Sequence, residues 1–214
     1  VIATSSRSGG FLEVSCEVIR HGIDTEVFSP LASEKTERPL TELPGKYLVG
    51  CAGRIRHQKG TDLFVDAMIS LLPQFPDWTA VVAGRTTREH ESFLNAQMKK
   101  IEAAGLQKRI IFVGEVEDIK PWYRCFSLFV APSRNEGFGL TPLEAMACET
   151  AVVTSDAGAY EELVGIGAGA VVPAGDLELL TRAVGLYLAD PALSERSGKA
   201  ARAHVLANFR LDNE

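Results

Sequence analysis

Two glutamates flank a glycine-rich turn near the middle of the chain. Glu136 stands directly before Gly137-Phe138-Gly139, and Glu144 follows about two turns inside a predicted helix. A helix that opens on glycines presents free backbone N–H groups and a partial positive charge, which suit a phosphate or a sugar oxygen. Carboxylates are poor phosphate ligands, but they accept hydrogen bonds from paired hydroxyls. The motif therefore points to a ligand with both phosphates and sugars, a nucleotide sugar.

Two cations lie in the loop that follows the first long apolar run. Gly53-Arg54 and Lys59-Gly60 bracket this loop, and a helix is predicted directly after it. An arginine can make a bidentate contact to phosphate, whereas a lysine offers a compact point charge. Because a lysine at a helix N-terminus opposes the helix macrodipole, Lys59 is expected to need a compensating anion. A diphosphate would supply that anion; the alternative is that both side chains are solvated at a loop tip.

The composition of the 214-residue chain is ordinary for a globular protein, with 46% hydrophobic and 23% charged residues. A net charge of −6 and a pI near 5.3 argue against nucleic acid as the main partner. No apolar run approaches the roughly 18 residues needed to span a bilayer. The chain starts at Val1 without a signal-peptide pattern, and we expect it to be a fragment of a longer cytoplasmic protein.

Metal binding and two common nucleotide chemistries are disfavoured by the motifs. The four cysteines and the four histidines are widely spaced and show no metal-ligand spacing. The cysteines are typical of small buried side chains in a reducing compartment. A Walker loop is absent, and Gly53 stands alone without a Gly-x-Gly-x-x-Gly fingerprint. P-loop hydrolysis and hydride transfer are therefore not expected.

From Lys46 onward, apolar β-branched runs alternate with amphipathic helical patterns. The predicted strands are 47–52, 79–83, 110–113, 127–131, 151–154 and 170–172. The predicted helices are 61–72, 89–104, 119–125, 139–147, 159–164, 177–189 and 193–207. Near-continuous apolar strands between amphipathic helices indicate a parallel sheet covered on both faces. The predicted fold class is α/β, a doubly wound, Rossmann-like parallel sheet.

The first 45 residues lack this alternation. A strand is predicted over 14–20 and a turn over 21–24. The proline-containing, charged segment 29–44 has little apolar periodicity and is interpreted as a linker or surface excursion.

Glycines and charged residues follow nearly every predicted strand. The loops concerned begin at Gly53, Gly84, Gly114, Pro132 and Ser155. Ligands of open parallel sheets bind outside the carboxyl ends of the strands, which meet at one edge. Glycine-rich turns are also common in α/β proteins without a ligand there, but their concentration at one edge favours a binding site. Arg85, directly after Gly84, is compatible with a ligand contact and with a surface position.

Three motifs occur together in a fixed order. The segment from His21 to Pro30 reads H-G-I-D-x-x-x-F-x-P, Gly53-Arg54 precedes Lys59-Gly60, and the E-G-F-G-x-x-x-x-E motif ends at Glu144. In this combination the chain resembles the retaining family 4 glycosyltransferases of GT-B fold. The resemblance covers nearly the whole chain, and within the family it is strongest to lipopolysaccharide-core mannosyltransferases.

The resemblance implies a role for each matched position. Glu144 would accept hydrogen bonds from ribose hydroxyls, and Glu136 would contact donor-sugar hydroxyls near the reacting carbon. Arg54 and Lys59 would stabilise the diphosphate leaving group, which makes Glu136, Arg54 and Lys59 the predicted catalytic residues. The other predicted donor-binding residues are Gly53, Arg85, Val116, Asp118, Gly137, Phe138, Gly139 and Leu140. Among these, Val116 and Asp118 lie where the family contacts the nucleobase.

The resemblance also implies the domain organisation. Residues 1–20 would be the tail of an N-terminal acceptor domain with the junction, 21–45 a linker, and 46–214 the donor-binding domain, the C-terminal half of a GT-B enzyme. The donor would be a nucleotide-diphosphate sugar, GDP-mannose by overall likeness, and no metal or other cofactor would be required.

The expected partners follow from the same resemblance. The full-length protein would transfer the sugar, with retention, to a glycan or glycolipid acceptor of the lipopolysaccharide core. It would act in the cytoplasm at the inner face of the membrane, which is compatible with peripheral membrane association. The isolated fragment would bind nucleotide and transfer no sugar at a useful rate.

Two other functions stay open on the residues alone. A nucleotide-sugar epimerase shares the GT-B architecture but needs paired acid and base groups at the sugar ring, and Glu136 shows no clear partner for that. A non-catalytic nucleotide-binding module is the other; the presence of Glu136 and Glu144 beside Arg54 and Lys59 argues against it. On chemical grounds Glu136 could also be a nucleophile.

Overall fold

A six-stranded parallel sheet forms the centre of the protein, in the order β5-β4-β3-β6-β7-β8. In this computed structural model, residues 2–3, 17–18, 21–30, 39 and 43–213 are described. The strands are β3 (Tyr47–Ala52), β4 (Trp78–Ala83), β5 (Ile110–Gly114), β6 (Leu128–Ala131), β7 (Ala151–Ser155) and β8 (Gly169–Val172). The strand order reverses between β3 and β6, which is where open sheets of this kind bind their ligands.

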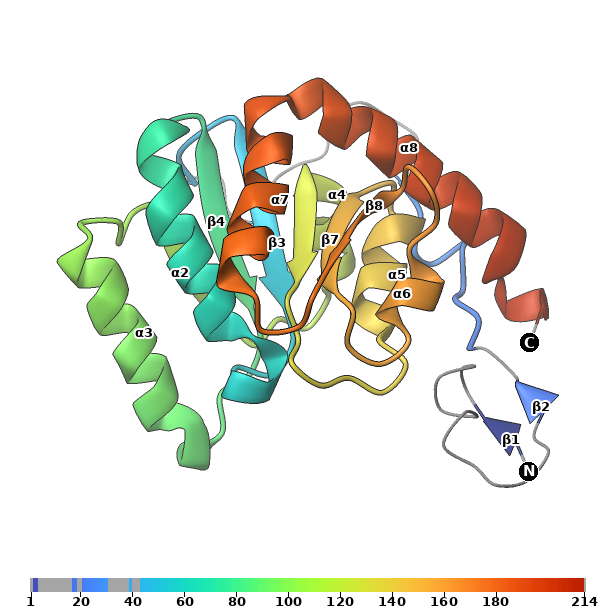
Figure 1. Ribbon diagram of the computed structural model, residues 1–214, viewed down its shortest axis with the longest axis horizontal. Coiled ribbons are helices and arrows are strands. Elements are labelled where there is room, and N and C mark those ends of the chain that lie inside the picture. Colours follow the sequence, from blue (N-terminus) through green and yellow to red (C-terminus); the bar gives the residue numbers. More distant parts are fainter. Residues whose placement is uncertain (1, 4–16, 19–20, 31–38, 40–42, 214) are drawn as a thin grey trace.

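Helices cover both faces of the sheet. They are α2 (Thr61–Leu71), α3 (Glu91–Ala103), α4 (Lys120–Cys125), α5 (Leu140–Ala147), α6 (Tyr160–Leu163), α7 (Leu177–Ala189) and α8 (Pro191–Asn208). Helices α2 and α7 pack side by side on one face (Figure 1). Helices α4, α5, α6 and α8 contribute to the hydrophobic cluster on the other face. The predicted doubly wound α/β fold is confirmed.

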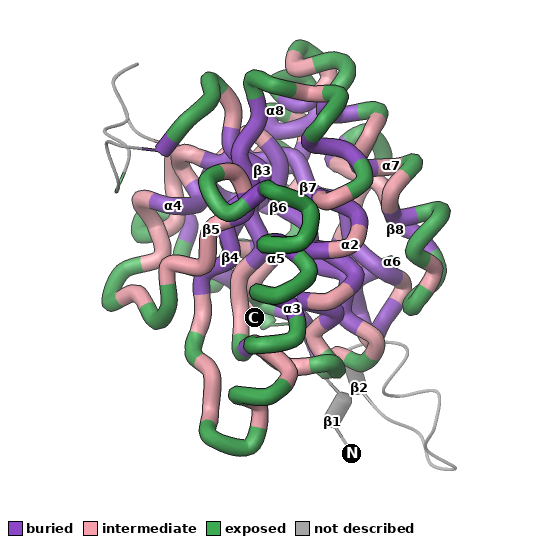
Figure 2. The backbone as a smooth tube through the Cα atoms, turned by 90° about the vertical axis from the view of Figure 1, so that its left-hand side faces the viewer, coloured by how far each residue is buried: buried purple, intermediate pink, exposed green. Residues whose placement is uncertain are grey.

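The central strands are buried along their whole length because both faces are covered. Every residue of β4, β6 and β7 is buried, and Figure 2 shows these strands in the interior, enclosed by helices with exposed outer turns. Successive residues point to opposite faces: Phe129 joins one hydrophobic cluster, whereas Leu128 and Val130 join the other. Continuous burial explains why the strands appear in the sequence as unbroken apolar runs.

Two helix starts differ by two residues from their predicted positions, and three others by one. The predicted helix 193–207 begins earlier, at Pro191, because the Asp190 carboxylate accepts a hydrogen bond from the Ala192 N–H, 3.1 Å away, and proline suits the first helical turn. The predicted helix 89–104 opens with a separate 3₁₀ turn, Arg88–His90, before α3 begins at Glu91. Both differences concern helix ends, where local capping decides the boundary.

Near the N-terminus, β1 (Ile2–Ala3) pairs in parallel with β2 (Glu17–Val18). The strand predicted over 14–20 thus includes β2, and its other residues lie outside the described part of the chain.

The turn predicted over 21–24 is wrong in its position. Ile23 is buried and pairs with the end of the chain: its N–H donates to the Phe209 carbonyl, 2.8 Å away, and its carbonyl accepts from the Leu211 N–H at 3.1 Å. The turn lies instead at residues 25–27, where the Asp24 carboxylate accepts hydrogen bonds from the N–H groups of Glu26 and Val27. A hydrophobic residue that can pair with a distant strand-like segment gives no local signal of that pairing.

The first residues of the predicted linker 21–45 are packed on the domain. The Arg202 guanidinium of α8 donates to the carbonyl oxygens of Thr25 and Phe28, at 3.3 and 3.1 Å. Arg124 at the end of α4 donates to the Ser29 carbonyl at 2.7 Å. Residues 31–38 and 40–42 of the predicted linker lie outside the described residues.

Candidate functional site

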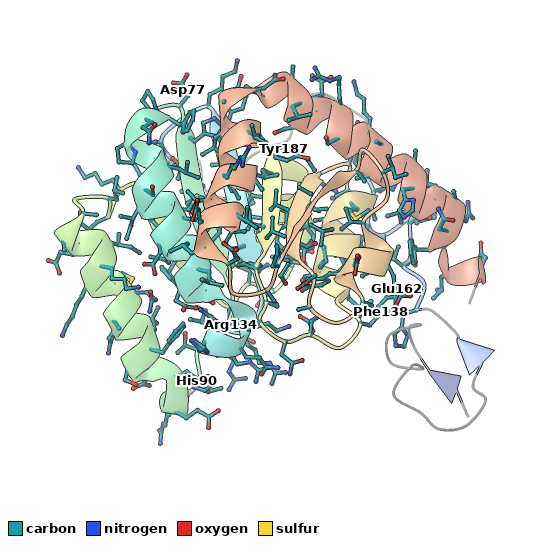
Figure 3. All side chains as sticks on the ribbon, in the orientation of Figure 1. Asp77, His90, Arg134, Phe138, Glu162 and Tyr187 are labelled. Atoms are coloured by element: carbon teal, nitrogen blue, oxygen red, sulfur yellow. The ribbon has the colours of Figure 1, made fainter. Side chains whose placement is uncertain are left out.

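The loops that leave the carboxyl ends of the strands are joined by backbone hydrogen bonds. The Gly84 N–H donates to the Gly114 carbonyl at 2.7 Å, and the Ile55 N–H donates to the Arg85 carbonyl at 3.0 Å. The Arg134 N–H donates to the Gln58 carbonyl at 2.8 Å. In Figure 3, Arg134 and Phe138 lie at the edge opposite Asp77, which precedes β4. Predicted site loops that are distant in sequence therefore meet at one edge of the sheet.

Lys59 and Glu136 form an ion pair at the centre of this edge. The Lys59 ammonium lies 2.5 Å from the Glu136 carboxylate, with 21% and 13% of the two side chains exposed. Lys59 ends a 3₁₀ turn, His57–Lys59, directly before α2. The anion expected to compensate a lysine at this helix start is therefore supplied by the protein itself. A donor diphosphate would meet a lysine that already has a partner.

Three further groups hold the Glu136 carboxylate. The Tyr160 hydroxyl donates to it at 3.0 Å, the Ser133 hydroxyl lies 3.4 Å away, and the Gly137 N–H donates to its other oxygen at 3.1 Å. Burial alone would raise the pKa of Glu136, but the hydrogen bond and charge of Lys59, with the Tyr160 hydroxyl, hold the pKa below its usual value. Glu136 is therefore ionised and fixed before any ligand binds.

Glu144 lies in a different environment. Its carboxylate accepts a hydrogen bond from the buried Tyr123 hydroxyl at 2.8 Å. Burial raises the pKa of Glu144, and the Tyr123 hydrogen bond offsets this only in part. Its position on α5 and its spare acceptor capacity suit a ligand that brings hydroxyl donors.

The glycine-rich turn brings the backbone of α5 close to α6. Gly139 is the N-cap of α5 with φ +92°, and a Cβ at this position would overlap the Tyr160 ring. Both constraints require glycine. Among the described residues, no side chain caps this N-terminus. Leu140 is exposed, whereas Phe138 is buried and meets the His21 ring edge-on, with centroids 5.1 Å apart.

Arg54 and Arg85 lie on the same edge, outside the ion pair. Both side chains are exposed, and with Arg56 and His90 they border a small hollow of about 30 Å³. The Arg85 guanidinium lies 4.0 Å from the Glu115 carboxylate. Gly53, with φ +137°, begins this loop, and a Cβ at Gly84 would overlap the Gly53 carbonyl. The structure thus places both arginines beside the site, with side chains exposed to solvent.

The two predicted nucleobase positions differ in exposure. Val116 is half-buried against the hydrophobic cluster of α4 and α5. Asp118 is exposed, and its carboxylate accepts from the Lys120 N–H at 3.0 Å and from the Lys120 ammonium at 2.8 Å. The Lys120 hydrogen bond lowers the pKa of Asp118. Asp118 therefore also stabilises the start of α4 (Lys120–Cys125), beside any contact to a base.

An ion pair that the sequence does not predict joins the two central loops. The Arg134 guanidinium makes two hydrogen bonds to the Asp62 carboxylate, both 2.8 Å, and a third to the His57 carbonyl at 2.8 Å. Burial opposes ionisation of Asp62, but Arg134 outweighs it and lowers the pKa of Asp62. Arg134 lies in a loop and Asp62 lies 72 residues earlier, in the first turn of α2. No local sequence pattern indicates that two such distant residues pair.

Tyr123 and Tyr160 were also missed as site residues. Each appears in the sequence as an apolar position of a short helix. Their hydroxyls, which reach the two glutamates, become visible only when α4, α5 and α6 are packed together.

The remaining features of the described residues lie outside this edge. Among all the described residues, no group of three His, Cys, Asp or Glu side chains could hold a metal ion. No described helix is long and apolar enough to cross a membrane. A hollow of about 410 Å³ lies at the opposite edge, near the first residues of β3 and α8. It contains none of the residues that carry the predicted chemistry, so we base the site on the contacts around Glu136.

The chain belongs to the glycosyl transferases group 1 family, whose pattern matches residues 33–204. The predicted family resemblance is confirmed. The chain is 60% identical over 215 residues to the lipopolysaccharide core biosynthesis mannosyltransferase LpcC of Rhizobium leguminosarum bv. viciae. The match covers 100% of this chain and 61% of that protein. It is 49% identical to the corresponding LpsB of Rhizobium meliloti (strain 1021), covering 100% of this chain and 62% of LpsB. The chain thus spans about three-fifths of the length of these relatives.

Solved structures agree with the GT-B assignment. The C-terminal domain of the glycosyl transferase group 1 protein LpcC from Francisella tularensis is 36% identical, with a TM-score of 0.83, covering 89% of this chain and 100% of that one. HepE of Anabaena, solved with UDP-glucose, is 25% identical with a TM-score of 0.86, covering 99% of this chain and 60% of HepE. The predicted C-terminal half of a GT-B glycosyltransferase is confirmed as the fold.

Proposed function

We propose that this domain binds a nucleotide-diphosphate sugar, GDP-mannose, and presents it for transfer to a lipopolysaccharide-core acceptor. The observation that carries the proposal is the meeting of Lys59 and Glu136 at the carboxyl edge of the sheet, next to the uncapped start of α5. A cation, a carboxylate and free backbone donors thus lie together, which supports a site for a ligand with both phosphate and sugar groups. The 60% identity to a named mannosyltransferase supports mannose as the sugar.

The chemistry requires positive charge where the donor breaks. Cleavage between the anomeric carbon and the phosphate oxygen leaves negative charge on the nucleoside diphosphate and an oxocarbenium-like sugar. Groups that bind this charge more strongly as it develops lower the barrier. Lys59, Arg54 and the N-terminus of α5 would do so without a metal, which is why we propose that none is needed.

The two carboxylates would divide the recognition of the donor. Glu144, with one tyrosine donor and spare acceptor capacity, would accept the ribose hydroxyls. Glu136 would accept hydroxyls of the sugar near the reacting carbon. Val116 and Asp118 would lie beside the base, and Arg85 would approach it or the phosphates.

The transfer would proceed with retention of the anomeric configuration. The leaving phosphate would take the acceptor proton, so no separate base is required. Glu136 is held by three side-chain hydroxyl or ammonium groups in the free protein, an arrangement that supports a binding role over a nucleophilic one. The acceptor would be a glycan or glycolipid held by a part of the protein outside this chain, at the cytoplasmic side of the membrane.

Product analysis of the longer protein tests this function. A protein that carries this domain together with the region present in its relatives would be incubated with GDP-mannose, with and without a lipopolysaccharide-core acceptor. We expect mannosylated acceptor with retained anomeric configuration by NMR. Conversion of GDP-mannose to another nucleotide sugar without acceptor would contradict the proposal and indicate an epimerase.

A further inference from the structure

We propose that Tyr160 is the positioning residue for Glu136: it holds the carboxylate when Lys59 leaves it for the diphosphate of the donor. The inference rests on the proposed function, because Glu136 is there the sugar-binding carboxylate. It adds a residue of α6 to the contacts of Glu136, which otherwise come from the loops after β3 and β6.

In the proposed function, the Glu136 carboxylate and the donor diphosphate compete for the Lys59 ammonium. In the free protein its ammonium lies 2.5 Å from Glu136, and in the proposed complex it must neutralise the diphosphate. A lysine ammonium is a compact charge on a flexible stem and can turn between two such partners. When it turns, Glu136 loses its shortest hydrogen bond.

Tyr160 cannot follow the ligand in the same way. Its side chain is 1% exposed, and its ring occupies the space that a side chain at Gly139 would need. The packing of the ring therefore fixes the position of its hydroxyl, 3.0 Å from the carboxylate, independently of Lys59. The Ser133 hydroxyl, at 3.4 Å, is a weaker second contact.

The consequence concerns the charge and orientation of Glu136. Lys59 from the loop before α2 and Tyr160 from α6 are the titratable groups in hydrogen-bond contact with it among the described residues. Burial favours the protonated carboxyl, and Lys59 and Tyr160 oppose that effect. After Lys59 leaves, the Tyr160 hydroxyl is the nearest side-chain donor to the carboxylate and keeps Glu136 ionised and aimed at the sugar.

A carboxyl NMR titration of the chain tests this assignment. The Glu136 resonance, identified by its loss in Glu136→Gln, would be followed with pH in wild type, Tyr160→Phe, Lys59→Gln and the double variant Lys59→Gln/Tyr160→Phe. We expect Tyr160→Phe to raise the pKa of Glu136, and to raise it further in the Lys59→Gln background. Tyr187→Phe, which removes the hydroxyl of a buried tyrosine in the other hydrophobic cluster, is the matched control and should leave it unchanged.

Calorimetric titration of the same variants with GDP-mannose and with GDP measures the effect on ligand binding. Tyr160→Phe should weaken binding of GDP-mannose about tenfold, the effect of one lost hydrogen bond to an ionised group, and should change binding of GDP less than about twofold. Equal weakening of both ligands would show a general structural effect and overturn the proposal.

The two proposals fail in different ways. If wild type binds no nucleotide, the proposed function fails. The titration of Lys59→Gln and of Lys59→Gln/Tyr160→Phe still reports whether Tyr160 holds the carboxylate. If a folded Tyr160→Phe protein, judged by its thermal unfolding, shows an unchanged Glu136 pKa in both backgrounds, the positioning role is wrong.

Discussion

At the scale of single residues, the two glutamates of the motif are prepared differently. Glu136 is paired with Lys59 and is kept ionised, whereas Glu144 is buried with one tyrosine donor and has a raised pKa. The sequence predicted both carboxylates at this edge from their spacing around the glycines. It could not distinguish their environments, because these depend on Tyr160 and Tyr123 from other helices.

Replacing Glu144 should separate stability from binding. Because the pKa of Glu144 is raised in the folded state, its contribution to stability is present below the unfolded-state pKa and is lost as the pH rises through the folded-state pKa. Glu144→Gln removes the buried charge and keeps an acceptor for Tyr123. We therefore expect a higher melting temperature than wild type near pH 7.5, a difference that disappears toward about pH 3, where glutamate is protonated in both states, and weaker nucleotide binding.

Thermal unfolding at the two pH values, with calorimetric titration of GDP, checks this expectation. Glu195→Gln is the matched control, since Glu195 pairs with Lys199 on the exposed face of α8. A Glu144→Gln protein that melts lower than wild type at neutral pH would contradict the environment assigned to Glu144.

At the scale of elements, Arg134 joins the loop before α2 to the loop before α5. Its guanidinium makes two hydrogen bonds to Asp62 and one to the His57 carbonyl. Glycine contributes to the same contact, since a Cβ at Gly60 would overlap the Pro132 carbonyl. We infer that this junction helps to fix the distance between Lys59 and Glu136. The six strands were predicted to within two residues because short apolar runs mark them in the sequence, whereas the contact between the loops has no local pattern.

Arg134→Lys should loosen that junction. Lysine keeps the charge but cannot reproduce the bidentate contact, so we expect the free energy of unfolding to fall by about 1–3 kcal/mol. Hydrogen exchange of the backbone amides between Arg54 and Gly60 should become faster, and GDP should bind more weakly. Unchanged exchange in this loop would show that the backbone alone fixes it. Arg196→Lys, at an exposed pair with Asp190, is the control and should alter none of these quantities.

At the scale of the whole molecule, the chain corresponds to one part of its longer relatives. The chain covers 61% of LpcC from Rhizobium leguminosarum. The segment from His21 to Pro30 is packed against α4 and α8, so this segment is part of the folded domain. Composition and alternation sufficed to predict the domain, but the docking of Ile23 on Phe209 joins positions 186 residues apart and could not be predicted.

The chain alone should bind donor without transferring its sugar. In the proposed function the acceptor is held outside this chain, so incubation with GDP-mannose and acceptor should give no product above the level without protein. Mass spectrometry of the acceptor checks this, with the Rhizobium leguminosarum LpcC as positive control. Efficient transfer by the chain alone would show that this domain also holds the acceptor.

In the proposed function, the carboxyl edge of the sheet is a nucleotide-sugar site. Calorimetric titration of the chain with GDP, UDP and ADP, repeated on Arg54→Ala and Glu144→Ala, tests it most directly. We expect selective binding of GDP and at least tenfold weaker binding by both variants, since each loses a hydrogen bond to a charged group. Absence of binding at millimolar ligand, or equal binding by wild type and both variants, would contradict the account.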